Sequence, residues 1–410
     1  MTVQSLLMEP GARVEVFGGA LEIPTEGNLY VVRRPASDCS VPILRPVNSD
    51  QFQHNGPAKI RKTVLENLLK SAQLLPDMEP VDAQNEFSRL IHALPESTVL
   101  ADGYHFSPSE EPPEIVSFLL RRISGDHIVP LDASVPGAFT MFDSLRCVSD
   151  VVRTKRFVES VGETVRWLEG RIPNREIRVC DAGCGSLPVL SIAAALASSR
   201  VKCTALELNP RSAAVAREII QGMGLREQIE VVETDILGYE PSEPFDVVVS
   251  ETMDVGLANE PLVQVMAHMK QYISPGGVML PQSVILKAAF VSTRRQSERD
   301  KARVVVNNAE YDAIDPDWLT IGSYRLGETV EDIHYHIGTK GWRGLFNLLV
   351  TNTVQIIGDQ LLGPYNSAIT LAKQVKQDSS RVFVGAAIGG KSVGVCVAYP
   401  PGGTMFARHI

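Results

Sequence analysis

The feature of this chain that most constrains its fold is an alternation of short apolar runs with helical patterns, which begins near residue 140. The apolar runs lie at residues 177–180, 201–208, 229–232 and 245–250, and the helical patterns between them at 189–198 and 213–223. A helical pattern at 148–168 comes before them, and a helix at 261–273 and a strand at 278–280 are expected after them. Near-continuous apolar strands that alternate with helices are typical of a parallel sheet covered on both faces. Ligands of such sheets bind beyond the carboxyl ends of the strands. The alternation therefore predicts an α/β fold with its functional residues at those ends.

The segments on either side of this alternation have different patterns. Residues 1–135 combine two short strand patterns with helical patterns at 60–75, 86–94 and 114–123, which we interpret as a small mixed α/β module. After residue 280 strand patterns dominate, at 284–291, 344–350, 354–357, 382–387 and 393–398, and predict a β-barrel-like domain. A polar stretch at 292–317 is a candidate inserted arm. We therefore expect three domains, at residues 1–135, 136–280 and 281–410.

Composition narrows the classes of partner. The net charge of −9 argues against general nucleic-acid binding, which needs clustered Lys and Arg. No apolar run approaches the ~18–20 residues that cross a bilayer, and the N-terminus lacks a signal pattern. The six cysteines include no C-x-x-C pair, which favours reduced thiols over a zinc site or disulfides. We expect a cytoplasmic protein that binds neither nucleic acid nor membranes.

A glycine-rich loop, Asp181-Ala182-Gly183-Cys184-Gly185, follows the first apolar strand and precedes a helix. Glycine lets the backbone approach a ligand closely and adopt conformations that other residues avoid. The dinucleotide fingerprint G-x-G-x-x-G would need a third glycine where Pro188 stands, which argues against NAD and FAD. A plain tight turn between strand and helix is the alternative for this loop taken alone.

Two acidic residues follow the next two strands. Glu207 ends the second strand, where a carboxylate can accept hydrogen bonds from both hydroxyls of a ribose, and Asp235 follows the third, where it can receive an adenine amino group. Each taken singly could be a loop acid or a helix cap. Together with the glycine loop they resemble the class I S-adenosylmethionine (SAM)-dependent methyltransferases. The resemblance implies SAM as cofactor, bound by Asp181, Gly183, Gly185, Glu207 and Asp235.

A second motif follows the fourth strand, where Ser250-Glu251-Thr252-Met253-Asp254 leads on to Glu260. Two carboxylates can grip a guanidinium at a fixed orientation, because this cation is planar and offers five donors. The segment resembles the double-E loop of the protein arginine N-methyltransferases, whose two glutamates hold the substrate guanidinium. The resemblance implies that Glu251 and Glu260 are catalytic and that they bind the substrate together with Met253. Surface acids that cap neighbouring helices are the alternative.

Two segments before the glycine loop resemble the N-terminal helices of the same family. They are Met141-Phe142-Asp143-Ser144 and Asp150-Val151-Val152-Arg153-Thr154. The resemblance implies that Phe142 folds over the cofactor and that Arg153 pairs with its carboxylate, whereas an ordinary exposed arginine is the alternative. The family usually dimerises through an arm, so we expect a homodimer, with residues 292–317 as the candidate arm.

Departures from the family fall mostly on the substrate side. Met141 and Leu145 stand where the family has tyrosines, and Asp254 replaces a glycine. The family's T-H-W loop, which carries a histidine, has no clear match, and the nearest stretch by position is 366–370. Without that histidine, Glu260 or water would take the proton that the substrate loses.

These departures predict an altered substrate. Asp254 would bind the α-ammonium of free arginine, and residues 1–135 would cover the pocket. We expect SAM-dependent N-methylation of a guanidino nitrogen of free L-arginine or a related small molecule, in natural-product biosynthesis. Three alternatives stay open: methylation of protein arginine, methylation of another small molecule, and a non-catalytic SAM-binding partner subunit.

Overall fold

The computed structural model describes most of the central part of the chain and selected strands at both ends. The described residues are 3–7, 13–16, 19–22, 28–32, 78–96, 113–123, 139–257, 260–292, 302–306, 309–313, 318–326, 333–338, 344–374, 376–377, 381–382, 384–387, 394–399 and 406–409. The helix expected at 60–75 lies outside them.

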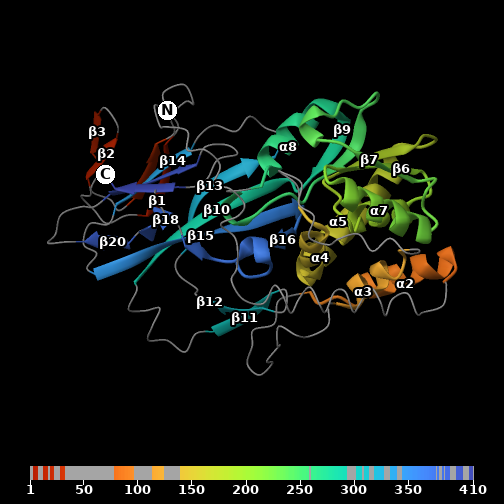
Figure 1. The fold of residues 1–410 in the computed structure, drawn as a ribbon. Coiled ribbons are helices and arrows are strands. Elements are labelled where there is room, and N and C mark those ends of the chain that lie inside the picture. Colours follow the sequence, from red (N-terminus) through yellow and green to blue (C-terminus); the bar gives the residue numbers. More distant parts are fainter. Residues whose placement is uncertain are drawn as a thin grey trace.

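A parallel sheet of five strands has the order β7-β6-β5-β8-β9 and lies on the right in Figure 1. Its strands are β5 (Ile177–Ala182), β6 (Val201–Glu207), β7 (Ile229–Glu233), β8 (Phe245–Val249) and β9 (Ile273–Leu280). The chain leaves β5 toward β6 on one side and returns to β8 on the other. The strand order therefore reverses between β5 and β8, which is where an open α/β sheet forms its ligand crevice.

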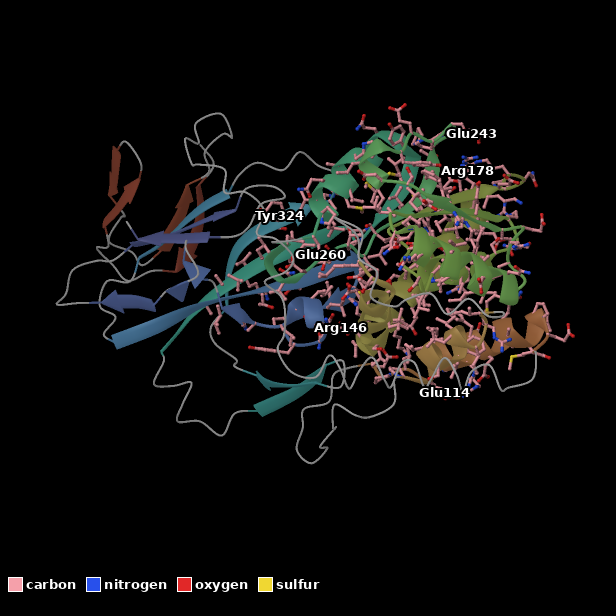
Figure 2. The ribbon with its side chains drawn as sticks, in the orientation of Figure 1. Glu114, Arg146, Arg178, Glu243, Glu260 and Tyr324 are labelled. Atoms are coloured by element: carbon pink, nitrogen blue, oxygen red, sulfur yellow. The ribbon has the colours of Figure 1, made fainter. Side chains whose placement is uncertain are left out.

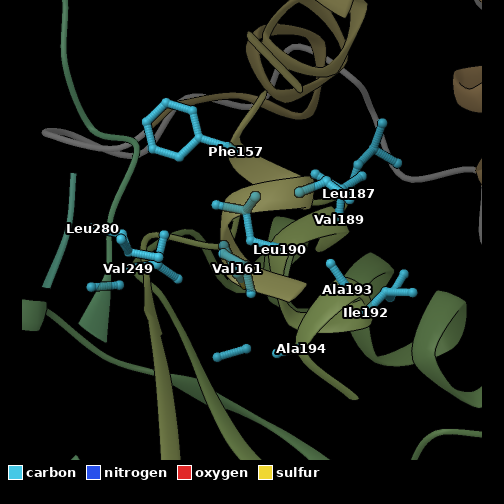
Figure 3. Packing of buried hydrophobic residues seen from close by; sticks show 14 of the residues in the cluster. Phe157, Val161, Leu187, Val189, Leu190, Ile192, Ala193, Ala194, Val249 and Leu280 are labelled. Atoms are coloured by element: carbon cyan, nitrogen blue, oxygen red, sulfur yellow. The ribbon is translucent and has the colours of Figure 1, made fainter. Parts of the chain in front are cut away.

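The helices that join these strands are α6 (Val189–Ala197), α7 (Pro210–Gly222) and α8 (Leu262–Met269), and α5 (Val151–Arg171) precedes the sheet. Right-handed crossovers place α6 and α8 on opposite faces, because they join strands on opposite sides of the reversal. Figure 3 shows the apolar core beside α6, with Phe157 and Val161 of α5 near Leu190 and Val249. All residues of β8 are buried and closely packed, so the loop that follows β8 begins from a fixed position.

Three helices precede α5, namely α2 (Pro80–His92), α3 (Glu114–Leu120) and α4 (Met141–Ser149); α2 and α4 pack on α5, and α3 packs on α2 and α4. A Thr140–Asp143 capping box starts α4. Lys155 of α5 is buried and donates to the carbonyls of His92 and Leu94, at 3.0 and 3.1 Å, which stabilises the end of α2. Further toward the N-terminus, β1 (Val3–Leu7) pairs with β4 (Asn28–Val32), and β2 (Arg13–Val16) with β3 (Gly19–Glu22).

Two sheets make up most of the described C-terminal part. One contains β10 (Ser283–Ser292), β13 (Leu319–Arg325), β15 (Gly344–Ile357), β16 (Gln360–Leu362), β17 (Lys373–Gln374) and β20 (Val384–Ala387). The other contains β14 (Ile333–Gly338), β18 (Lys376–Gln377), β19 (Arg381–Val382), β21 (Gly394–Tyr399) and β22 (Phe406–His409). All but one of their strand pairs are antiparallel. Within the candidate arm, β11 (Ala302–Val306) and β12 (Ala309–Ala313) form a hairpin.

The predicted fold class is confirmed: a Rossmann-like parallel sheet follows a mixed α/β N-terminal region and precedes a separate β-rich, barrel-like part. The three domain boundaries stay predictions. No helix in the described part of the chain has the length and apolarity to span a membrane.

Several element boundaries expected from the sequence are wrong, among them the start of the helix expected at 86–94, which lies at Pro80. The helical pattern at 148–168 is interrupted, because Asp150 separates α4 from α5 and turns its buried side chain toward the C-terminal part. The strand expected at 278 starts at Ile273 and runs through Pro275, while the preceding helix ends at Met269 and continues as a short 3-10 helix. The strands expected at 344–350 and 354–357 are one strand, β15, whose central polar residues are buried.

Candidate active site

A cavity of about 460 Å³ opens at the carboxyl ends of the parallel strands. Small-molecule sites in proteins are usually about 300–1,000 Å³. Its walls come from the loops after β5, β6, β7 and β8 and from helices α4, α5, α6 and α8. Among the residues that line it are Ser144, Cys147, Arg153, Asp181, Gly183, Gly185, Glu207, Asp235, Leu237, Glu251, Thr252 and Glu260.

Of the predicted cofactor residues, Phe142 alone is not placed, because its side chain lies outside what the structure describes. The other six line this cavity, as do both predicted catalytic glutamates. The sequence-predicted site residues from five separate elements are thus brought to one place.

Two glycines of the loop after β5 have positive φ and close neighbours. Gly183 has φ +94°, and a Cβ there would lie 2.6 Å from Cγ2 of Thr252. Gly185 has φ +64°, and a Cβ there would lie 2.8 Å from Oγ of Ser144. The glycine loop is thus pressed between α4 and the loop that carries Glu251, so side chains are excluded at both positions.

We expect Gly183→Ala to weaken SAM binding at least tenfold, since the left-handed backbone costs an L-residue roughly 1–2 kcal/mol and the added methyl group displaces Thr252. Isothermal titration calorimetry with SAM measures the change. Gly170→Ala is the control, because a Cβ at this glycine of α5 meets nothing within 4 Å. An unchanged affinity in Gly183→Ala would contradict the close packing described above.

Asp181 is buried at the end of β5, and one of its oxygens accepts hydrogen bonds from the Ser191 backbone N–H and hydroxyl, at 3.1 and 2.6 Å. Burial raises the pKa of Asp181 to about 6, although the bonds from Ser191 oppose the rise. Because Ser191 lies in the first turn of α6, Asp181 fixes the start of this helix against the glycine loop. The residue both lines the cavity and shapes it.

Each carboxylate oxygen of Glu207 accepts a hydrogen bond from a backbone N–H. Its Oε2 accepts from the Gly185 N–H at 2.9 Å and its Oε1 from the Asn209 N–H at 2.7 Å. Burial raises its pKa, and these backbone bonds oppose the rise. Each carboxylate oxygen has two lone pairs, so both oxygens retain capacity for a further donor. A ribose diol, with two adjacent hydroxyl donors, matches that capacity.

Asp235 combines the two roles that the sequence left open. Its Oδ1 accepts from the Leu237 N–H at 2.9 Å and caps the short 3-10 helix η3 (Ile236–Gly238), while the residue also lines the cavity. The second oxygen of an ionised carboxylate is an acceptor suited to an exocyclic amine. A glycine loop, a diol acceptor and an amine acceptor along one cavity fit SAM.

Arg153 is buried and makes three polar contacts, so it is not the exposed helix arginine of the alternative interpretation. Its guanidinium donates to Oε1 of Glu251 and to the carbonyl of Cys147, both at 2.8 Å, and its Nε lies 3.6 Å from Oδ2 of Asp150. Burial alone would lower its pKa, but the carboxylates of Glu251 and Asp150 raise the pKa above its ordinary value. Its predicted contact with the cofactor carboxylate stays a prediction.

Glu251 and Glu260 are both held in a desolvated environment. Burial raises the pKa of Glu251 to about 7, although the positive charge of Arg153 opposes the rise. Burial raises the pKa of Glu260 well above its ordinary value, and the negative charges of Glu251 and Asp254 raise it further. Figure 2 places Glu260 where the parallel sheet meets the strands of the C-terminal part. This pair of carboxylates is therefore a site that a cation would stabilise.

The other two predicted substrate residues lie behind the cavity wall. Met253 is buried with 1% exposure, and neither Met253 nor Asp254 is among the residues that line the cavity. The backbone carbonyl of Asp254 accepts a hydrogen bond from the Asn352 amide at 2.9 Å. Their roles in substrate binding stay predictions. Residues 78–96 and 113–123, the parts of the N-terminal helices that the structure describes, contribute nothing to the cavity lining either.

Sequence reasoning missed several residues of the site. Ser144 accepts a hydrogen bond from the Ser186 N–H and packs on Gly185, Cys147 lines the cavity, and Asp150 and Ser367 form a buried pair. Ser144, Cys147 and Asp150 lie in or between the segments at 141–144 and 150–154 that resemble the family, and that resemblance could have indicated them. Ser367 was visible only as part of the stretch nearest by position to the family's T-H-W loop, and nothing in the sequence indicated its partner, which lies 217 positions earlier.

Comparison with known proteins identifies the sheet. Residues 179–277 match the family of methyltransferase domains. The sheet is thus similar to a class I methyltransferase domain of the protein arginine N-methyltransferase type, and the cofactor that its cavity fits is SAM.

Two curated relatives carry arginine methyltransferase names. One is the arginine N(omega)-methyltransferase of Streptomyces achromogenes subsp. streptozoticus, 35% identical over 28% of this chain and 33% of that protein. The other is the probable protein arginine N-methyltransferase 6.1 of Oryza sativa subsp. indica, 28% identical over 38% of each chain. The chain thus matches about a third of the length of these relatives.

Among solved structures, the PRMT1 enzyme–prozyme complex of Trypanosoma brucei with AdoHcy aligns over 62% of this chain and 86% of that chain. Its identity is 14% and its TM-score 0.43, which describes a distant likeness.

Proposed function

We propose that this protein is a SAM-dependent N-methyltransferase that methylates a guanidino nitrogen of free L-arginine or of a related small guanidino compound. One observation carries the proposal. Glu251 and Glu260, both half-buried, line the same cavity as the glycine loop and Glu207; desolvation raises both pKa values, and the negative charge of Glu251 raises that of Glu260 further. A permanently charged guanidinium between the two carboxylates would offset the unfavourable desolvation of both.

The protein's own residues would do three things for this reaction. When bound, SAM supplies the electrophilic methyl group. Glu251, oriented by Arg153, and Glu260 would hold the guanidinium so that one nitrogen faces that group, because transfer needs an aligned geometry. Their negative charges would keep the positive charge on the other two nitrogens and make the facing nitrogen more nucleophilic. The proton that this nitrogen loses would pass to Glu260 or to water.

A free amino acid is favoured over a protein substrate by the departures from the family. Leu145, at the position of a family tyrosine, is buried in α4, and no histidine lies among the described residues that line the cavity. The names of the relatives include both an arginine and a protein arginine methyltransferase. Methylation of protein arginine is therefore the second candidate. A homodimer, a cytoplasmic location and a natural-product pathway belong to the same proposal.

Incubation of the protein with SAM and L-arginine, followed by mass spectrometry, tests the proposal. We expect arginine to gain the mass of one methyl group, and an arginine-containing peptide to gain none. Agmatine and Nα-acetylarginine, which lack the α-carboxylate and the α-ammonium respectively, report which of these groups the site requires. Methylation of the peptide alone would overturn the small-molecule assignment and support the second candidate.

A further inference from the structure

A buried polar cluster lies outside the cavity, where α5 begins against the C-terminal part of the chain. Oδ2 of Asp150 accepts hydrogen bonds from the hydroxyl of Ser367 at 2.6 Å and from the Ala368 N–H at 2.8 Å. Asp150 is 2% exposed and Ser367 is 0% exposed. A buried carboxyl group is costly unless it is hydrogen-bonded, so these two donors stabilise Asp150 in its buried position.

The cluster continues to the catalytic carboxylate through Arg153. This guanidinium contacts Asp150 with Nε at 3.6 Å, the Cys147 carbonyl at 2.8 Å and Glu251 at 2.8 Å. All three partners are acceptors, and a planar guanidinium has fixed donor directions. A shift of Asp150 would therefore reorient Arg153, and Arg153 in turn holds Glu251.

Ser367 is itself held rigidly. It begins the 3-10 helix η6 (Ala368–Thr370) with a capping box, in which its hydroxyl accepts from the Ile369 N–H at 3.3 Å and its N–H donates to the Thr370 hydroxyl at 3.0 Å. The hydroxyl thus accepts from its own helix and donates to Asp150. A serine hydroxyl satisfies both roles without titrating in the neutral range.

The loop that carries Glu251 and the helix that carries Ser367 share one anchor on β15. The Asn352 amide, 0% exposed, donates to the carbonyls of Asp254 and Ile369 at 2.9 and 3.0 Å. Any displacement of η6 is therefore transmitted to the Glu251 loop by a second route. The C-terminal part of the chain contacts the site through these polar bonds, although none of its described residues lines the cavity.

We propose that Ser367 is a positioning residue for methyl transfer: its hydroxyl holds Asp150, and through Asp150 and Arg153 it sets the orientation of the Glu251 carboxylate. The proposal rests on the proposed function for its kinetic effect, but the coupling to Glu251 is independent of the substrate. Ser367 acts by orientation and takes up no proton.

Three variants test the proposal. Ser367→Ala should lower kcat for arginine methylation by roughly 10–100-fold, because small displacements of a catalytic group cost about this much, and should leave the affinity for S-adenosylhomocysteine unchanged within about threefold. Ser367→Thr keeps the hydroxyl and should restore most of the rate. Ser198→Ala is the matched control: the Ser198 hydroxyl, also buried, donates to a carboxylate oxygen of Glu169 at 2.5 Å near the amino end of β6, away from the cavity. It should lose similar thermal stability but keep kcat.

A second measurement needs no substrate. Carbon-13 NMR of carboxyl-labelled glutamate, with Glu251→Gln for assignment, follows the titration of Glu251. In Ser367→Ala the pKa of Glu251 should rise, because Arg153 is held less firmly beside it. If the wild-type protein methylates no guanidino compound, the proposed function fails while this titration still decides the coupling. An unchanged titration, or a kcat loss equal to that of Ser198→Ala, would overturn the positioning role.

Discussion

Replacing Glu251 by glutamine should abolish methylation of the guanidino substrate while SAM binding stays nearly intact. Glutamine keeps the shape of the side chain, and its amide oxygen still accepts a hydrogen bond from Arg153. The negative charge that localises the substrate's positive charge is lost, and the buried guanidinium of Arg153 loses one of its carboxylates. Removing one preorganised electrostatic contact in an active site typically costs about 10²–10³-fold in kcat.

The SAM side of the cavity should be unaffected, because Gly185, Glu207 and Asp235 make their backbone hydrogen bonds independently of Glu251. Calorimetry with SAM and mass spectrometry of the product separate the two effects. Glu163→Gln, on the exposed face of α5, is the control with the same charge change and should retain wild-type turnover. Full activity in Glu251→Gln would instead favour a methyltransferase that acts on an uncharged nucleophile. A large loss of SAM affinity would contradict the role assigned to Glu251.

The fold was predictable where local pattern and tertiary environment agree. The apolar strands β5 and β8 are buried as their composition predicts, and the glycine loop lies at a strand end because the βα alternation requires a turn there. The prediction was wrong at β15, where buried Thr351 and Asn352 interrupt the apolar pattern. Their side chains bond to carbonyls of η6, a segment that the sequence does not reveal as a neighbour.

In the candidate site, too, residues with a local sequence signal were predictable and long-range contacts were not. Gly183 and Glu207 were recognisable because their chemistry follows directly from strand ends. The pairing of Arg153 with Glu251 joins residues 98 positions apart, and that of Asp150 with Ser367 joins residues 217 apart. Such pairs depend on how α5, the sheet and the C-terminal part pack together, which no local spacing encodes. The departure of residues 366–370 from the family was visible, whereas their contact with Asp150 was not.

The second large effect is on pH dependence. With its pKa raised to about 7, a substantial part of Glu251 is protonated at neutral pH in the free protein, and the pKa of Glu260 is raised as well. A guanidinium stays charged throughout this range, so only the carboxylates titrate. Both carboxylates must be ionised to hold the cation, so kcat/KM should increase with pH through the neutral range. Its value at pH 5 should be about 10²-fold or more below its value at pH 8.

The free energy of unfolding of the free protein should change with pH in the opposite direction. A carboxyl whose pKa is raised in the folded state binds more protons folded than unfolded, between its ordinary pKa of 4.5 and the folded value of about 7. The free energy of unfolding contributed by Glu251 therefore falls as pH rises through that window, and a bound guanidinium reverses the fall. Thermal shifts produced by L-arginine with S-adenosylhomocysteine should accordingly be larger at pH 8 than at pH 5. In Glu251→Gln the arginine-induced shift should be small at both values. A shift that is independent of pH in the wild-type protein would mean that these carboxylates do not hold the substrate cation.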